Sequence, residues 1–190
     1  GGCGGIVYTQ DEHCYWQIRS LADRGKPFSD LDLDLKDPSE FLFPALNFNL
    51  DELSCAIGFS TLSRLQETMD KRCEISRKID TALEESSVVF PCQHQPNCTA
   101  SPFFHTVEVA VDRLKVSKKA FAEAVAAEGI WINPDYRYVV SEWKWLQGKR
   151  KACTPNAVEF RDRTFNILFN EQFSDDDVRD VISSILKVES

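Results

Sequence analysis

Residues 45–58, with the sequence ALNFNLDELSCAIG, decide how the rest of the chain is interpreted. Pro44 and Asn47 are typical turn residues. From Leu53 onward, apolar side chains recur every three or four positions. The segment therefore predicts a turn that leads directly into a helix.

The residues before this segment predict a strand and a helix. Glycines dominate residues 1–5, and the apolar run Ile6–Thr9 follows them, which is typical of a buried strand. A helix should begin at Gln10 and end at Gly25. Its expected apolar side carries Cys14, Tyr15, Ile18 and Leu21. One strand and one helix cannot bury a core alone, so we expect them to belong to a larger sheet domain that starts before residue 1.

The apolar stripe that starts at Leu53 continues at helical spacing and predicts one long helix from about Asp51 to about Leu83. Gly58 indicates close packing, since glycine otherwise costs about 1 kcal/mol in a helix. Charged residues dominate beyond Leu65, so the second half should be solvated with one apolar face. Helices of this kind commonly link two domains.

The remainder of the chain predicts a compact α/β unit. Strands are expected at Val88–Phe90, Phe103–Val111, Ile130–Ile132 and Phe165–Phe169, and helices are expected to begin at Ser117, Pro155 and Ser174. This order favours a small, mostly antiparallel sheet with helices on one side.

Composition and charge exclude several classes of protein. The 190 residues are 43% hydrophobic and 11% aromatic, which are globular values. With 22 basic against 30 acidic side chains, the net charge of −8 argues against nucleic acid as a partner. No apolar run approaches the roughly 20 residues of a membrane helix, and no signal peptide opens the chain.

The seven cysteines are best interpreted as reduced thiols of a cytoplasmic protein, because their number is odd and the chain is not small. Cys92, His94 and Cys98 share a loop, but no second group of ligands accompanies them, so we expect no metal site.

Several motifs, in their order along the chain, resemble the middle and end of DegT/StrS-type sugar aminotransferases. Gly4–Thr9 resembles the family's Gly-Gly, strand and acidic helix start, and Glu128–Ile130 its turn into the strand of the last domain. Asn47, together with Glu52 and Gly58, resembles the family's Asn-x-Arg-Met-x-Glu-x-x-Ala-x-x-Gly segment. Residues 165–178 resemble its closing strand and Ser-Asp-Asp-Asp-Val helix.

The resemblance implies a pyridoxal-phosphate enzyme of the aspartate-aminotransferase fold, class α/β, of which this chain is the C-terminal half. Residues 1–50 would be the remnant of the large cofactor-binding domain and an interface loop. Residues 51–85 would be the bridging helix, and residues 86–190 the small C-terminal domain. No catalytic residue is then expected in the chain, because the lysine that links to the cofactor would lie upstream of Gly1.

The resemblance also implies site residues and partners. Asn47 would donate to the cofactor phosphate of the neighbouring subunit of a homodimer, although asparagine in a turn often only caps it. Tyr136, Arg137 and His105 are the candidates for substrate contact, and a packed histidine is the alternative for His105. Asn49 and Phe48 depart from the family's usual arginine and tyrosine, which puts the usual substrate-phosphate contacts in doubt.

Three functions remain open from the sequence. The first is a fragment of an aminotransferase that uses an amino donor and a nucleotide-linked keto sugar, with the cofactor not bound by this chain alone. The second is a sugar dehydratase of the same family, which has histidine in place of the lysine. The third is a non-catalytic α/β interaction module. The lysines of the chain, Lys118 among them, are expected to be exposed and charged.

Overall fold

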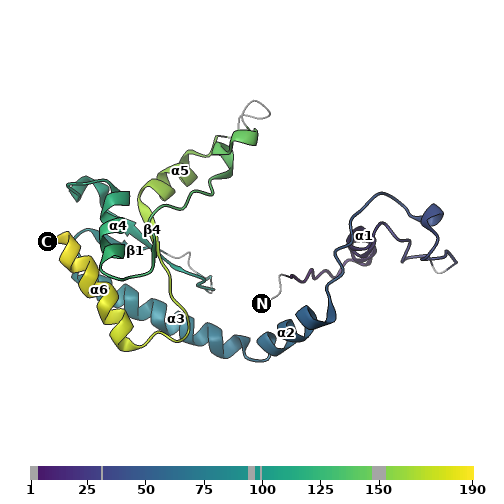
Figure 1. Ribbon diagram of the computed structural model, residues 1–190, viewed down its shortest axis with the longest axis horizontal. Coiled ribbons are helices and arrows are strands. Elements are labelled where there is room, and N and C mark those ends of the chain that lie inside the picture. Colours follow the sequence, from purple (N-terminus) through teal and green to yellow (C-terminus); the bar gives the residue numbers. More distant parts are fainter. Residues whose placement is uncertain (1–3, 31, 94–96, 99, 147–152) are drawn as a thin grey trace. The chain divides into compact units, whose positions relative to one another are not determined.

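The computed structural model describes residues 4–30, 32–93, 97–98, 100–146 and 153–190 and divides the chain into two compact units, residues 1–65 and 66–190 (Figure 1). The second unit has the mixed α/β fold with a small antiparallel sheet that the sequence predicts. Its strands are β1 (Val89–Pro91), β2 (His105–Val109), β3 (Ile132–Asn133) and β4 (Thr164–Ile167). They form one antiparallel sheet in the order β1-β2-β4-β3.

Three helices of the second unit begin where the sequence predicts, and α3 is the exception. They are α3 (Leu65–Ala82), α4 (Lys118–Ala127), α5 (Pro155–Asp162) and α6 (Asp175–Glu189), with short 3₁₀ turns at Leu83–Glu85, Val111–Arg113, Val140–Glu142 and Lys144–Leu146. Ser117 caps α4, and Ser174 with Asp177 forms a capping box on α6.

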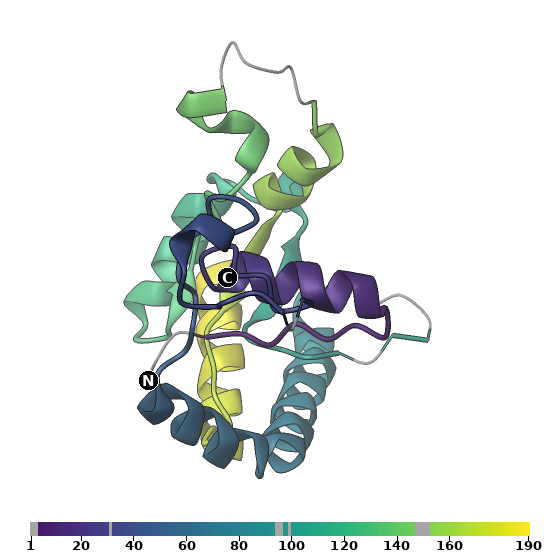
Figure 2. The ribbon, with the colours of Figure 1, turned by 90° about the vertical axis from the view of Figure 1, so that its right-hand side faces the viewer.

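One face of the sheet carries the core. Along β2, His105, Val107 and Val109 are buried while the residues between them are half-exposed. Val107 lies opposite Phe165 of β4, whose ring is 1% exposed. The core is completed by residues of α3, α4 and α6: Ile75, Ile79, Phe121, Ala122, Val125, Val178, Val181, Ile182 and Ile185. Figure 2 shows α6 beside α3, and an ion pair of 2.7 Å between Lys78 Nζ and Asp175 Oδ1 joins them.

The first unit contains α1 (Glu12–Ala22), a 3₁₀ turn at Pro38–Glu40 and α2 (Glu52–Leu62). Asp11 and Asp51 cap the two helices through their side chains. No residue of α2 is buried, and Leu53, Ile57, Phe59 and Leu62 expose between 43% and 78% of their surface.

Two expectations for this part of the chain are wrong. Ile6–Thr9 is not a strand: Ile6, Val7 and Tyr8 are 70–83% exposed, and no strand within the described residues pairs with them. A strand needs a partner for its backbone groups, whatever its composition.

The predicted single helix from Asp51 to Leu83 is two helices, separated by a turn at Ser63 and Arg64. The Thr61 hydroxyl donates to the Ile57 carbonyl and the Ser63 hydroxyl to the Ser60 carbonyl, at 2.9 and 2.8 Å. Hydroxyls that bond the preceding turn in this way compete with the helix ladder and bend or end it.

A compact loop joins α1 to the segment before α2. Arg24 N–H donates to the Leu46 carbonyl at 3.0 Å and Phe48 N–H to the Ala22 carbonyl at 2.8 Å. Gly25 sits in this loop at φ 78°, and a β-carbon there would lie 2.0 Å from the Phe43 carbonyl oxygen. The loop therefore requires glycine at position 25.

The carboxylate of Asp23 is buried in the same loop. Its two oxygens accept from Lys26 Nζ at 2.9 Å and Arg24 Nε at 2.7 Å. The hydrogen bond from Lys26 is the main cause that lowers the pKa of Asp23 from 3.8 to about 2, against the opposing effect of burial, while Arg24 and the Asn49 side chain lower it further. The backbone of Asp23 also pairs with that of Asn47. Asp23 thus fixes the turn that carries Asn47.

We predict that acid weakens this loop as Asp23 is protonated. Its folded pKa is depressed, so its stabilising contribution is complete above about pH 4 and is lost as pH falls toward about 2. Asp23→Asn should remove most of that pH dependence and increase hydrogen exchange of the Arg24 and Phe48 amides near pH 6. Asp30→Asn is the control. Unchanged exchange in Asp23→Asn would contradict the role of this carboxylate.

Candidate functional site

The candidate site residues lie in both units, and each group is described within its own unit. Asn47 belongs to the first unit, whereas Tyr136, Arg137 and His105 belong to the second. Among the described residues, no hydrogen bond or ion pair joins Tyr136, Arg137 and His105 to one another.

Asn47 is exposed and its side chain is oriented by one hydrogen bond. The Asn49 backbone N–H donates to Asn47 Oδ1 at 3.0 Å, which closes an Asx turn just before α2. Within the described residues, the Nδ2 amide of Asn47 donates to no protein acceptor. The capping alternative and the phosphate role are therefore compatible, because the oxygen holds the turn while the nitrogen stays available to an anion.

This arrangement fits one part of pyridoxal phosphate. A phosphate needs N–H donors, and Asn47 offers one on a turn that Asp23 fixes. The neighbouring Asn49 side chain is engaged with the Asp23 carboxylate. Among the described residues, the contact that fits pyridoxal phosphate is therefore one to its phosphate group.

Tyr136 and Arg137 lie on a surface formed by four aromatic rings. The Tyr136 ring centre is 6.0 Å from that of Phe104 and 5.3 Å from that of Tyr138, and Phe103 lies 5.8 Å from Phe104. The Arg137 side chain is 76% exposed and its Nε lies 3.9 Å from Asp135 Oδ2. Rings and a guanidinium together suit a ligand that is both planar and anionic.

Lys118 anchors the segment that carries these residues. Its side chain is 7% exposed, and its Nζ donates to the Pro134 carbonyl at 2.9 Å and to Asp135 Oδ1 at 3.4 Å. The expectation that Lys118 is exposed is wrong, because the first turn of α4 directs it toward these two acceptors. Lys149 and Lys151 lie outside the described residues, as do Gly1, Gly2 and Cys3.

His105 lies in the interior, between β2 and α3. It is 4% exposed, and its Nδ1 is 2.8 Å from the Ser76 hydroxyl. Its Nε2 is 3.1 Å from Asp80 Oδ1, close enough for an ion pair but outside hydrogen-bond geometry, so this buried nitrogen has no hydrogen-bond partner. The Asp80 carboxylate therefore lies near Nε2 but is not aligned to accept a hydrogen bond from it. A substrate role for His105 stays a prediction, whereas its burial and its hydrogen bond with Ser76 are observed.

A small cavity of about 210 Å³ borders this histidine and is lined also by Ser76, Cys92 and Thr106. Burial, followed by the charges of Glu108 and Asp80, raises the pKa of the Cys92 thiol to about 11. Cys92 is therefore a protonated, unreactive thiol near neutral pH. His94, which shares this loop, lies outside the described residues. Among the residues that the structure describes, no group of three or more His, Cys, Asp or Glu side chains is arranged to hold a metal ion.

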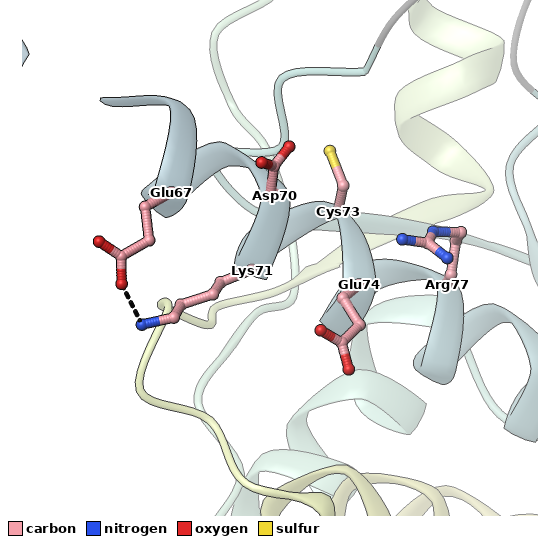
Figure 3. Close-up of a pocket in the computed structure, with 6 residues that line it drawn as sticks. All are labelled: Glu67, Asp70, Lys71, Cys73, Glu74 and Arg77. Carbon is pink, nitrogen blue, oxygen red and sulfur yellow. Dashed lines mark hydrogen bonds and ion pairs between the residues drawn. The ribbon is translucent and has the colours of Figure 1, made fainter. Parts of the chain in front are cut away.

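The exposed side of α3 forms a wide hollow of about 540 Å³ that sequence reasoning did not single out (Figure 3). Glu67, Lys71, Glu74 and Arg77 line it, and Lys71 Nζ lies 2.8 Å from Glu67 Oε1. All of its side chains come from one solvated helix, and ion pairs of this kind on a surface contribute little. This hollow therefore offers no assembled chemistry.

We predict that His105 stabilises the second unit. Ser76→Ala leaves Nδ1 buried without its partner, which should cost about 1–3 kcal/mol in the free energy of unfolding. His105→Ala should cost at least as much. Chemical denaturation measures both, with Ser183→Ala as the exposed control. If both variants are as stable as the parent, His105 is not a packing residue.

The similarity to known proteins extends over nearly the whole chain. The sequence matches the DegT/DnrJ/EryC1/StrS aminotransferase family over residues 1–186. It is 26% identical to the spore coat polysaccharide biosynthesis protein SpsC of Bacillus subtilis, over 97% of this chain and 49% of that protein. The chain spans about half the length of the curated relatives it matches. Between Gly4 and Ser190, no described helix has the length and apolar character to cross a membrane.

Solved structures agree on the fold. An aminotransferase from Psychrobacter cryohalolentis has a TM-score of 0.80 at 17% identity, over 95% of this chain and 50% of that one. The pyridoxal-phosphate form of the sugar aminotransferase Spr1654 from Streptococcus pneumoniae gives 0.75 at 18% identity, over 95% and 44%. PseC of Helicobacter pylori, an aminotransferase of pseudoaminic acid biosynthesis, gives 0.75 at 20% identity, over 95% and 47%. The chain belongs to the DegT/DnrJ/EryC1/StrS aminotransferase family.

Proposed function

We propose that these 190 residues are the C-terminal half of a pyridoxal-phosphate-dependent aminotransferase that acts on a nucleotide-linked keto sugar. The observation that carries this proposal is the family match over residues 1–186, combined with coverage of about half of each relative. The sugar aminotransferase Spr1654 and PseC, an aminotransferase of pseudoaminic acid biosynthesis, support a sugar substrate.

The cofactor, when bound, supplies the electron sink for amino transfer, and the protein orients it. In this proposal Asn47 Nδ2 donates to the phosphate of a cofactor held mainly by the neighbouring subunit of a homodimer. The exposed turn, its fixed Oδ1 and its position just before α2 support that role. The uncovered apolar side chains of α2 support a second subunit or a further part of the protein packing against this helix.

Tyr136 and Arg137 are proposed to contact the substrate. The exposed Arg137 guanidinium suits the diphosphate of a nucleotide sugar, because it presents several donors in one plane. The Tyr136 ring and its aromatic neighbours suit the planar base or the apolar side of the sugar. Lys118 acts indirectly, by holding the segment through Pro134 and Asp135.

The lysine that links to the cofactor is proposed to lie upstream of Gly1. Two described lysines that are not freely exposed are committed elsewhere: Lys118 binds Pro134 and Asp135, and Lys26 binds Asp23. A linking lysine must lose its charge in its site, and ion pairing opposes that loss. The described cysteines are all free thiols, which supports a reducing, cytoplasmic location.

We predict that Asn47→Ala weakens cofactor binding in the protein that includes the upstream half. Loss of one hydrogen bond to a charged phosphate should raise the dissociation constant of pyridoxal phosphate about tenfold or more. Titration followed by the visible absorbance of the bound cofactor measures this, with the exposed Asn156→Ala as control. Equal affinity of Asn47→Ala and the parent would refute the phosphate role.

The same preparation tests the reaction. Amino transfer from an amino acid to a nucleotide-linked keto sugar should release keto acid, whereas the 190 residues alone should release none. Loss of a sugar hydroxyl without amine incorporation would instead establish the dehydratase. Turnover by the 190 residues alone would mean that a lysine of this chain links to the cofactor.

A further inference from the structure

The segment that precedes β2, residues 100–105, is fastened along one face of α3. Four side chains of α3, spaced so that they share that face, bond to the segment: Met69, Arg72, Cys73 and Ser76. The Ser101 hydroxyl donates to the Met69 sulfur at 3.6 Å. The Cys73 thiol donates to the Ala100 carbonyl at 3.4 Å, and the Ser76 contact is the one to His105 described above.

Arg72 joins this segment to the turn that follows β4. Its Nη1 donates to the carbonyls of Pro102 and Phe103, at 3.2 and 3.4 Å. Its Nε and Nη2 lie 3.1 and 3.0 Å from Glu171 Oε2. The guanidinium carbon also lies 5.9 Å from the centre of the Phe169 ring, and only 19% of the Arg72 side chain is exposed. All three nitrogens of this guanidinium are therefore committed to protein groups.

The backbone that Arg72 holds carries part of the aromatic surface described above. Phe103 is 78% exposed, and its ring centre lies 5.8 Å from that of Phe104. The Phe104 ring in turn lies 6.0 Å from the Tyr136 ring. An exposed ring has few packing neighbours, so its direction depends on its backbone. Lys118 fixes the segment of Tyr136, and Arg72 fixes the segment of the two phenylalanines.

We propose that Arg72 is a positioning residue for the aromatic surface to which Tyr136 belongs. Its bonds to two backbone carbonyls hold Phe103 and Phe104 so that their rings and that of Tyr136 form one face for a planar ligand. A guanidinium is required because one edge pairs with the Glu171 carboxylate while the other reaches the carbonyls, whereas lysine has a single nitrogen. This inference rests on the substrate contacts proposed above.

The test compares Arg72→Met and Arg72→Lys in the protein that includes the upstream half. The probe is UDP, because it joins a planar base to a diphosphate. Methionine keeps an apolar stem but donates no hydrogen bond, so Arg72→Met should weaken UDP binding about tenfold in calorimetry and leave the affinity for pyridoxal phosphate unchanged. Arg72→Lys keeps a charge beside Glu171 and should recover stability in thermal unfolding, while its UDP binding stays weak.

Arg113→Met is the matched control. Arg113 Nη1 donates to the Ser87 carbonyl at 2.7 Å, and its guanidinium carbon lies 5.8 Å from the centre of the Phe90 ring. This variant loses the same kinds of contact, made to β1 and the turn before it, and should bind UDP as the parent does. The proposal is overturned if Arg72→Met retains full UDP affinity, if Arg72→Lys restores it, or if Arg113→Met loses as much.

A second readout separates this inference from the proposed function. In protein with selectively labelled rings, the nuclear Overhauser effect between Phe104 and Tyr136 reports their contact without any ligand. We expect the effect in the parent and in Arg113→Met, and its loss in both Arg72 variants. Its retention in Arg72→Met would overturn the positioning role. If the parent does not bind UDP, the nucleotide-linked substrate of the proposed function fails, and this ring contact still decides whether Arg72 positions the rings.

Discussion

The apolar face shared by β2 and β4 is the constraint on which the C-terminal unit depends. Val107 and Phe165 lie opposite one another on that face, and α3, α4 and α6 cover it. Burial of such side chains is the main favourable term in folding, and the described residues of the first unit contribute none to this core cluster. The first unit relies instead on a tight loop around Gly25 and the paired carboxylate of Asp23. This difference explains why α2 remains a helix with exposed apolar side chains.

The candidate site residues are likewise divided between the two units. Asn47 depends on the backbone pairing with Asp23, so the donor proposed for the cofactor phosphate is held by a buried charge and not by a core. Tyr136 and Arg137 depend on Lys118, which binds the segment from the first turn of α4. In both places a lysine–aspartate pair fixes a turn, and an exposed polar side chain on that turn is left available to an anionic ligand.

The sequence predicted the C-terminal unit well because its signals are local and its partners lie within the unit. Alternation along residues 103–111 placed His105, Val107 and Val109 on one face, and Ser117, Pro155 and Ser174 marked helix starts. The Ile6–Thr9 prediction failed because strand formation depends on a pairing partner, and the continuous-helix prediction failed at the hydroxyls of Thr61 and Ser63.

Contacts between distant residues explain what sequence reasoning missed at the sites. Lys118 meets Pro134 and Asp135, His105 meets Ser76, and Arg72 meets Pro102 and Phe103, and no periodicity reports these encounters. Asn47 was found only through the family resemblance, since a turn asparagine alone indicates a cap.

The central claim is that Asn47 completes the phosphate site of a cofactor bound across a subunit interface. A crystal structure of the protein with its upstream half and pyridoxal phosphate tests this most directly. The account predicts Asn47 Nδ2 within about 3 Å of a phosphate oxygen of the cofactor held by the partner subunit. A structure in which Asn47 faces solvent, with the phosphate fully bound by other donors, would contradict it.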